Sequence, residues 1–180
     1  MKILNCGNQY TIKVKVYIGS ASVESDPIIK KILIDDLYPE SARTYLFNKG
    51  NVYDDLTGGW SGNNNDYTSI TSENMSINSI SGKAYFLSTN KKINTEGFTK
   101  LIVVRQNYKY LSSDGSYPAQ NYIGISEEKF QYSNFQVNVA AKENAIGELD
   151  LSDSTLKDGY IYIEAANTYT TDILQVFLVK

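Results

Sequence analysis

Two short apolar runs within residues 82–110 constrain the fold of this chain more than any other feature. The first run, Ala84–Leu87, reads AYFL, and the second, Leu101–Val104, reads LIVV. Both are rich in aromatic or β-branched residues, and the Asn, Lys, Thr and Gly between them are turn residues, a combination that predicts sheet and not helix. The second run is apolar at every position, so we expect both of its faces to be covered, as in the inner strands of a β-sandwich.

The rest of the chain repeats this pattern roughly every 8–15 residues, with Gly, Asn, Asp or Ser between the apolar runs. Helix signals are weak. Further strands are expected at residues 45–47, 67–70, 75–80, 121–126, 135–141 and 147–151. We therefore predict an all-β fold, an antiparallel β-sandwich of jelly-roll type with a short β-hairpin appended at its N-terminus.

Charge and composition exclude several classes of partner. The 180 residues carry 17 Lys and Arg against 20 Asp and Glu, a net charge of −3, and no element concentrates the basic residues, which argues against nucleic-acid binding. No apolar run approaches the ~20 residues that a membrane helix needs, so no membrane partner is expected. The single cysteine, Cys6, excludes an internal disulfide. The start, MKILNC, lacks the apolar h-region of a signal peptide, so we expect a protein made in the bacterial cytoplasm without one.

The N-terminal region indicates a separate hairpin. Residues 10–18 alternate apolar and polar side chains, which predicts a half-buried strand, while residues 19–27 indicate a polar loop and residues 28–34 a second strand. The charged segment that follows contains Pro39 and ends the β pattern. The predicted domains are therefore residues 1–43, a hairpin plus linker, and residues 44–180, the sandwich.

This hairpin resembles the last two strands of a fibronectin type III domain. The resemblance rests on Leu4, on Tyr10 with the TIKVKV that follows it, and on the ESDP from Glu24. In that family the tyrosine hydroxyl bonds back to the backbone near the leucine. The alternative is an unrelated amphipathic hairpin.

Two further resemblances lie within residues 44–180. LFNKGN from Leu46, followed by TGGW, resembles the opening of β-sandwich domains in prophage tail and virion proteins of Gram-positive bacteria, especially clostridia. GYIYIEAAN from Gly159 and ILQVFLV from Ile173 resemble the last two strands of jelly-roll carbohydrate-binding modules, and INTEGFTKL from Ile93 resembles a turn before a central strand of those folds. These resemblances imply a binding role on a virion, or outside the cell after release.

This sequence contains few of the residue types that enzymes use for catalysis. The absence of histidine removes Ser-His-Asp and Cys-His nucleophiles and the commonest zinc ligand, and no phosphate-binding glycine loop is present. A glycosidase-like carboxylate pair is the remaining possibility. The candidates are Asp54, Asp55, Glu127, Glu128 and Glu164. Adjacent strand residues point to opposite faces, so neighbouring carboxylates do not converge by default, and we predict that the chain is not an enzyme.

No cofactor and no metal site are predicted. Jelly-roll carbohydrate modules often carry a structural calcium ion bound by loop oxygens, so calcium is the one ion to consider. The acidic residues in suitable turns are Asp54, Asp55, Asp150 and Asp153. Solvated turn carboxylates are the simpler interpretation.

Aromatic side chains are the best candidates for ligand binding, because sugar rings present apolar C–H faces that stack on aromatic planes. We predict a site on a concave sheet face, with Trp60 as a possible further platform. The predicted ligand-binding residues are Trp60, Arg105, Tyr108, Tyr110 and Tyr122. For each aromatic residue the alternative is a packing role, with tyrosine hydroxyls in contact with water.

Three functions follow from these observations. The first is a non-catalytic, tail-associated module that binds bacterial cell-surface polysaccharide weakly and gains strength from several copies on one particle. The second is a purely structural β-sandwich spacer of the tail or baseplate, which packs against other virion proteins or copies of itself as a homo-oligomer. The third is a glycan-active hydrolase with a carboxylate pair.

Overall fold

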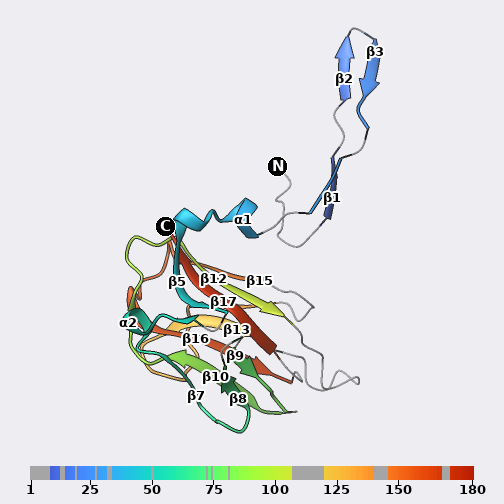
Figure 1. Ribbon diagram of the computed structural model, residues 1–180. Helices are drawn as coiled ribbons and strands as arrows, with labels where there is room; N and C mark the ends of the chain where they lie inside the picture. The colour runs from blue at the N-terminus through green and yellow to red at the C-terminus, as the bar shows by residue number, and fades with distance from the viewer. Residues whose placement is uncertain are drawn as a thin grey trace. The chain divides into compact units, whose positions relative to one another are not determined.

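The computed structural model describes residues 9–12, 15–18, 20–26, 28–31, 34–49, 51–71, 73, 75–80, 82–106, 120–139, 146–167 and 171–180. The chain divides into two compact units, Met1–Ser41 and Ala42–Lys180. This division lies two residues before the boundary that the sequence predicts at residue 43. In Figure 1 the strands of the first unit are blue, and the second unit runs from cyan to red.

The first unit contains four short strands paired within one hairpin. β1 (Gln9–Ile12) pairs antiparallel with β4 (Ile28–Lys31), and β2 (Lys15–Ile18) pairs antiparallel with β3 (Ala21–Glu24). The prediction of a polar loop over residues 19–27 is therefore wrong in part, since β3 lies within it. Ala21 is opposite Ile18 and Glu24 is opposite Lys15, so the loop is a tight turn at Ser20.

The described side chains of β2 and β3 are exposed. The exposed fractions are 56% for Val16, 67% for Tyr17 and 74% for Val23. The prediction of a half-buried strand over residues 10–18 is wrong for Val16, which belongs to its apolar face, because a two-stranded ribbon has no second layer of its own to cover either face. Tyr17 belongs to the opposite face, which the prediction leaves exposed. The strand predicted to reach residue 34 ends at Lys31, and Ile34 begins the one-turn helix α1 (Ile34–Leu37), which the 3-10 turn η1 (Glu40–Ala42) follows.

The second unit is an antiparallel β-sandwich, which confirms the predicted fold class. One layer is a six-stranded sheet in the order β14-β13-β16-β10-β7, with β11 pairing beside β16. Figure 1 shows β16, β13, β10 and β7 together in this layer. Its strands are β7 (Trp60–Gly62), β10 (Ala84–Thr89), β11 (Ile93–Asn94), β13 (Tyr122–Ser126), β14 (Gln136–Asn138) and β16 (Asp158–Ala166).

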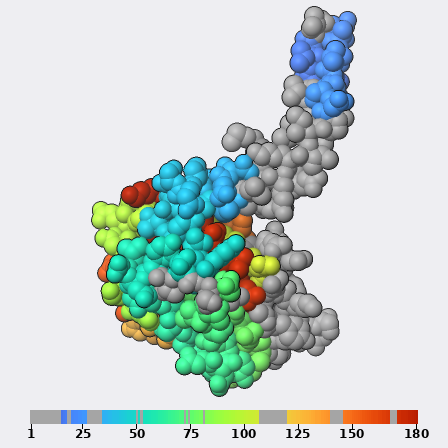
Figure 2. Space-filling view, in the orientation of Figure 1, coloured from blue at the N-terminus to red at the C-terminus, as the bar shows by residue number. Residues whose placement is uncertain are grey.

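The other layer is a seven-stranded sheet in the order β15-β12-β17-β5-β6, with β9 pairing with both β17 and β8. Its strands are β5 (Arg43–Asn48), β6 (Asn51–Val52), β8 (Thr68–Ile70), β9 (Met75–Ile77), β12 (Lys100–Gln106), β15 (Ile146–Asp150) and β17 (Thr171–Val179). In the space-filling view, the segments from β5 to β8, cyan to green, cover much of the second unit's face turned toward the viewer (Figure 2).

The core lies between the two sheets and follows the period-two pattern of the strands. On β16, the odd-numbered Ile161 and Ile163 belong to the core cluster, so the even-numbered side chains point to the outer face of the six-stranded sheet. On β12, the three residues Leu101–Val103 are fully buried, so both faces of this strand are covered as its apolar run predicts. The two apolar runs of residues 82–110 lie in different sheets, β10 in one and β12 in the other.

The segment before β7 contains a helical turn that the sequence does not reveal. α2 (Asp54–Thr57) ends at Gly58, which has φ +64° and forms a left-handed C-cap. Asn90 and Lys91 both donate backbone N–H groups to the Thr57 carbonyl, at 2.9 and 2.8 Å, so the turn is attached to the end of β10. A Cβ at Gly58 would lie 2.7 Å from Cγ of Lys91, so any other residue would adopt a strained φ and displace the Lys91 side chain.

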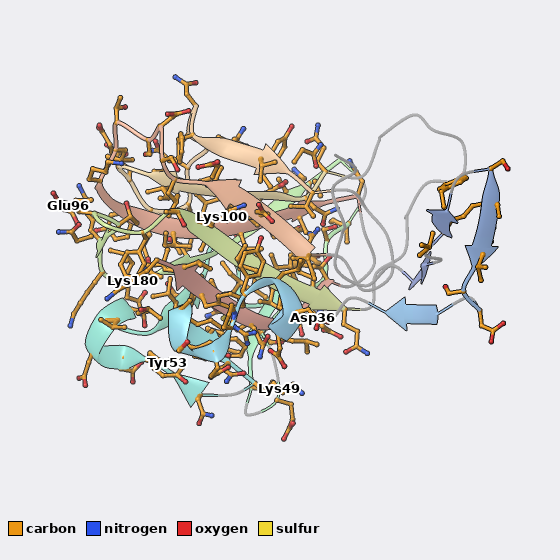
Figure 3. All side chains as sticks on the ribbon, turned by 90° about the horizontal axis from the view of Figure 1, so that it is seen from above. Asp36, Lys49, Tyr53, Glu96, Lys100 and Lys180 are labelled. Atoms are coloured by element: carbon orange, nitrogen blue, oxygen red, sulfur yellow. The ribbon has the colours of Figure 1, made fainter. Side chains whose placement is uncertain are left out.

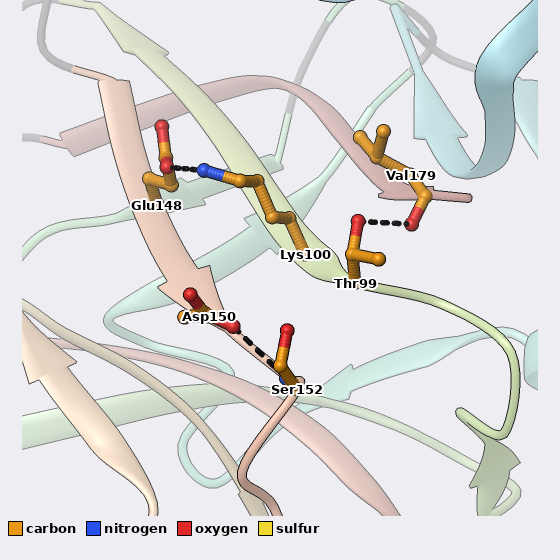
Figure 4. Close-up of polar contacts among 6 residues, drawn as sticks. All are labelled: Thr99, Lys100, Glu148, Asp150, Ser152 and Val179. Atoms are coloured by element: carbon orange, nitrogen blue, oxygen red, sulfur yellow. Dashed lines mark hydrogen bonds and ion pairs between the residues drawn. The ribbon is translucent and has the colours of Figure 1, made fainter.

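A partly exposed ion pair lies at the edge of the seven-stranded sheet, where β15 pairs with β12 (Figure 4). The Lys100 ammonium forms an ion pair with the Glu148 carboxylate, and both side chains are partly exposed. Asp150 accepts a hydrogen bond from the Ser152 N–H at 2.9 Å, and this bond holds the pKa of the Asp150 carboxyl below its usual range. Figure 3 shows Lys100 together with Glu96, which lies in the exposed turn before β12.

Candidate functional site

Residues 127–135, which follow β13, lie over the outer face of the six-stranded sheet, and we call this segment the strap. Lys129 binds the sheet near β7: its Nζ donates to Oγ of Ser61 at 2.8 Å and to Oδ1 of Asn90. Burial of the ammonium lowers the pKa of Lys129. Phe130 has φ +58°, an uncommon left-handed conformation for a large residue, and it redirects the backbone directly after this contact.

Tyr132 is the residue by which the strap contacts the centre of the sheet. Its hydroxyl donates a hydrogen bond to Oε1 of Glu164 at 3.0 Å. Its ring meets Phe86 edge-on at 5.1 Å between centroids and Tyr122 edge-on at 5.8 Å. Despite these three contacts, 48% of Tyr132 remains exposed. The ring is therefore both fixed and accessible.

Glu164 is fully buried near the C-terminal end of β16. Its Oε2 accepts the backbone N–H of Tyr122 at 3.2 Å. The ladder between β13 and β16 begins at Ile123 opposite Ile163, and an isolated bridge joins Gln120 to Ala166, so the carboxylate bonds to the backbone at the place where the ladder is interrupted.

Burial raises the pKa of Glu164 to about 7, because a carboxylate is poorly solvated there. The Tyr122 N–H, the Tyr132 hydroxyl and the charge of Arg105 act in the opposite direction and lower it. Arg105 comes from β12 of the other sheet and is itself 1% exposed. A buried carboxyl that titrates near neutral pH is thus placed directly beneath the half-exposed tyrosine.

Tyr162 holds the far end of the strap. Its hydroxyl accepts the backbone N–H of Ser133 at 3.3 Å and donates to Oε1 of Gln136. Burial raises the pKa of Tyr162 to about 12. The Tyr162 ring lies against Gly124 on β13, where an added Cβ would lie 2.5 Å from the tyrosine oxygen, so the absence of a side chain at Gly124 makes room for the ring.

A pocket of about 400 Å³ lies where the strap meets the loop after β15. Hydroxyl and amide groups and three apolar side chains line it together with two carboxylates. The lining residues are Ser126, Glu127, Glu128, Gln131, Tyr132, Ser133, Asn134, Phe135, Thr155 and Leu156. The lining is mostly polar and combines the Tyr132 ring with several hydrogen-bonding groups.

The two carboxylates give the pocket a negative character. Glu127 and Glu128 are exposed, and Oε2 of Glu128 accepts a hydrogen bond from Nε2 of Gln131 at 2.7 Å. The two lysines nearest to the lining in sequence are bound elsewhere: Lys129 to the β7 region, and Lys157 to the Leu151 carbonyl at 3.3 Å. Among the described residues, neither lysine nor arginine lines the pocket.

The structure places the predicted ligand-binding residues in different environments. Trp60 is 6% exposed in the core, and its Nε1 donates to the Leu46 carbonyl at 3.1 Å, so it has the packing role and offers no stacking platform at the surface. Arg105 and Tyr122 both contribute to the environment of Glu164, although Arg105 is buried and does not line an open face. Tyr108 and Tyr110 lie outside the described residues.

No sequence pattern singles out Tyr132, and Glu164 stands out in the sequence only as a candidate for a catalytic carboxylate pair. A glutamate at an outward position of an otherwise apolar and aromatic strand is an available signal, since a charge there requires a partner. Among the described groups, no second carboxylate contributes to the pKa shift of Glu164.

Metal and membrane features are absent from the described residues. No three His, Cys, Asp or Glu side chains gather there as metal ligands would, the calcium candidates in turns included. No helix in the described part of the chain combines the length and the apolar character needed to cross a bilayer.

Comparison with known proteins assigns no family. No protein-family model matches the chain, and no curated protein matches it significantly. A solved structure of the CBM51-2 and INT domains of ZmpB from Clostridium perfringens aligns with 99% of this chain at a TM-score of 0.31 and 9% identity. The chain spans 39% of the length of that structure, and this likeness is too weak to indicate a shared fold or function.

Proposed function

We propose that the second unit is a non-catalytic module that binds glycan in the pocket beside Tyr132. The observation that carries this proposal is the half-exposed Tyr132 ring at the rim of a polar pocket, held from below by Glu164, Phe86 and Tyr122. Because the ring is ordered before a ligand arrives, binding loses little side-chain entropy.

A sugar matches the chemistry of this lining. Pyranose rings have apolar C–H faces that pack on an aromatic ring, and equatorial hydroxyls that need partners in the ring plane. Ser133, Asn134 and Thr155 supply both donors and acceptors for those hydroxyls, and Gln131 adds an amide. The volume of about 400 Å³ has room for a short oligosaccharide segment.

The charge of the pocket narrows the class of glycan. Glu127 and Glu128 repel uronic acids and phosphate-bearing polymers and are compatible with neutral or amine-bearing sugars. We therefore assign the pocket to neutral or amine-bearing surface glycan, and expect weak affinity at a single exposed site.

The test is a calorimetric titration of the full chain with three matched tetramers, of N-acetylglucosamine, glucosamine and galacturonic acid. We expect binding of the first two and none of the third. Tyr132→Ala should weaken binding by about tenfold, because it removes the stacking surface. Tyr17→Ala, which removes an exposed tyrosine from the other unit, is the control and should change nothing.

Two results contradict the proposal. One is the absence of heat with every tetramer and with a wider set of bacterial wall oligosaccharides at millimolar concentration. The other is binding that Tyr132→Ala leaves intact.

A second candidate function, self-assembly as a structural spacer, is favoured by the first unit. Val16 and Val23 are directly opposite each other on β2 and β3, and both are exposed. A second copy that covers this apolar pair would give a homo-oligomer. Light scattering should then show concentration-dependent mass that the double variant Val16→Ser, Val23→Ser abolishes. A monomer at all concentrations contradicts this function.

We also propose that the chain belongs to a phage tail. The tail-associated role, the contacts with other virion proteins and the location on a virion or outside the cell are supported by the sequence resemblance of the LFNKGN and TGGW segments. Several copies on one particle would turn weak single-site binding into firm attachment. Immunogold labelling of induced phage particles tests this: label on tails supports it, and label absent from intact particles contradicts it.

A further inference from the structure

We propose that Glu164 is a positioning residue for the ligand, whose buried carboxylate holds the Tyr132 ring at the rim of the pocket. This inference rests on the proposed function, because it assigns a role to a residue that acts only through Tyr132. Glu164 would then control the affinity for the ligand without touching it, since Glu164 is fully buried.

The strap is attached to the sheet on both sides of Tyr132, and Glu164 holds Tyr132 itself. Lys129 anchors one end to Ser61 and Asn90, and Tyr162 anchors the other through the Ser133 N–H. Between these anchors, the Tyr132 ring packs edge-on against Phe86 and Tyr122. The 3.0 Å hydrogen bond to Oε1 of Glu164 fixes its position along the sheet.

The strength of this hydrogen bond depends on the charge of Glu164. An ionised carboxylate is a stronger acceptor for a phenol than a protonated carboxyl group is. The Tyr122 N–H bonds to the other oxygen and fixes the carboxylate plane, so Oε1 stays directed at the Tyr132 hydroxyl. The titratable and charged groups that face Glu164 among the described residues are Tyr132 of the strap, Tyr122 of β13, Tyr162 of its own strand and Arg105 of β12.

The direction of the effect follows from the surroundings. Arg105 remains charged at all relevant pH values, and burial keeps the pKa values of Tyr132 and Tyr162 above their ordinary value. Burial raises the pKa of Glu164 to about 7, so Glu164 changes charge near neutral pH. As the pH rises through this value, the hold on Tyr132 strengthens and ligand affinity increases.

The same ionisation opposes the stability of the whole fold, because a charge forms in a buried place. Local order of the site and global stability therefore change in opposite directions with pH. If Glu164 served only the fold, its ionisation would destabilise the protein without tightening ligand binding.

The first arm of the test needs no ligand. The full chain is labelled with ¹³C at the tyrosine ε carbons, and the Tyr132 signal is identified by its loss in Tyr132→Phe. We expect this signal to titrate near pH 7 in the wild type and to be flat in Glu164→Gln. A Tyr132 signal that is indifferent to pH and to Glu164→Gln overturns the inference, whether or not a glycan binds.

The second arm measures affinity for the N-acetylglucosamine tetramer between pH 6 and pH 8. We expect the wild type to bind about threefold more tightly at the higher pH. Tyr132→Phe keeps the ring but lacks the hydroxyl, so it and Glu164→Gln should bind more weakly and without pH dependence. Circular dichroism checks that both variants fold.

The outcomes separate the inference from the proposed function. Failure of the tetramer to bind at any pH, with a normal Tyr132 titration, contradicts glycan binding of this kind and leaves the hold on Tyr132 intact. Binding with the same pH dependence in Glu164→Gln as in the wild type overturns the positioning role.

Discussion

Each outer face of the sandwich carries a glutamate, and the two side chains differ in their exposure to solvent. On the seven-stranded sheet, Glu148 lies at an exposed edge and pairs with Lys100 (Figure 4). On the six-stranded sheet, Glu164 lies under the strap, fully buried, and its environment contains tyrosines, a backbone N–H and the charge of Arg105. One carboxylate is screened by water, and the other is not.

The difference shows that burial, and not the presence of a cation, decides how a carboxylate behaves in this fold. An exposed ion pair gains little, because water solvates each partner nearly as well. A buried carboxyl has a raised pKa even with a guanidinium nearby, because desolvation exceeds the attraction. The strap over Glu164 accounts for this difference, and substitutions at Glu164, Gly124 and Glu148 test it.

Replacement of Glu164 by Gln should change the pH dependence of stability most. The pKa of Glu164 is about 7 in the fold and 4.5 ordinarily. Between these values the unfolded chain releases a proton that the folded chain retains, so the wild type loses stability as pH rises, by roughly 3 kcal/mol in total, and the loss levels off above pH 7. Glu164→Gln removes this pH-dependent loss of stability.

Urea unfolding at half-unit steps from pH 4.5 to pH 8 measures the effect. The free energies of unfolding of the wild type and Glu164→Gln should diverge with rising pH, in favour of the variant. Parallel curves over this range would mean that Glu164 is solvated in solution.

Gly124→Ala should remove the space that the Tyr162 ring occupies. The new Cβ would meet the ring and its oxygen at 2.5–2.7 Å, so the ring that anchors the strap must move. We expect a destabilisation of about 2 kcal/mol, typical of overpacking. Thermal unfolding measures it, with Gly97→Ala as a control for added side-chain volume in open space, although its φ of +80° makes that control mildly destabilising as well. Equal losses in the two variants would contradict the close packing.

Glu148→Gln should have the smallest effect. Loss of the ion pair with Lys100 is expected to change the free energy of unfolding by about 0.5 kcal/mol or less, because both partners reach solvent. Glu96→Gln in the exposed turn before β12 is the matched control (Figure 3). A loss above about 2 kcal/mol at Glu148 would show that the outer edge is less hydrated than its exposure indicates.

Local sequence patterns predict the long strands well. The LIVV run predicts the doubly covered β12, because strand length and apolar character are local properties. The segments from Gly159 and Ile173, which resemble the last two strands of jelly-roll carbohydrate-binding modules, form β16 and β17. β3 and α2 are missed, since their few residues have weak propensities and become ordered through pairing or capping. Trp60 beside an Asn-rich loop suggests a surface platform, but the indole finds its partner at the Leu46 carbonyl, far away in sequence.

The sequence alone determines that this chain builds a β-sandwich with a hairpin before it, because apolar period and turn residues act within a few positions of one another. Which side chains form a site is decided only in three dimensions. Tyr132 and Glu164 are 32 residues apart, and Arg105 belongs to the opposite sheet. Their proximity, and the loss of water that raises the pKa of Glu164, arise only when the strap lies over the sheet.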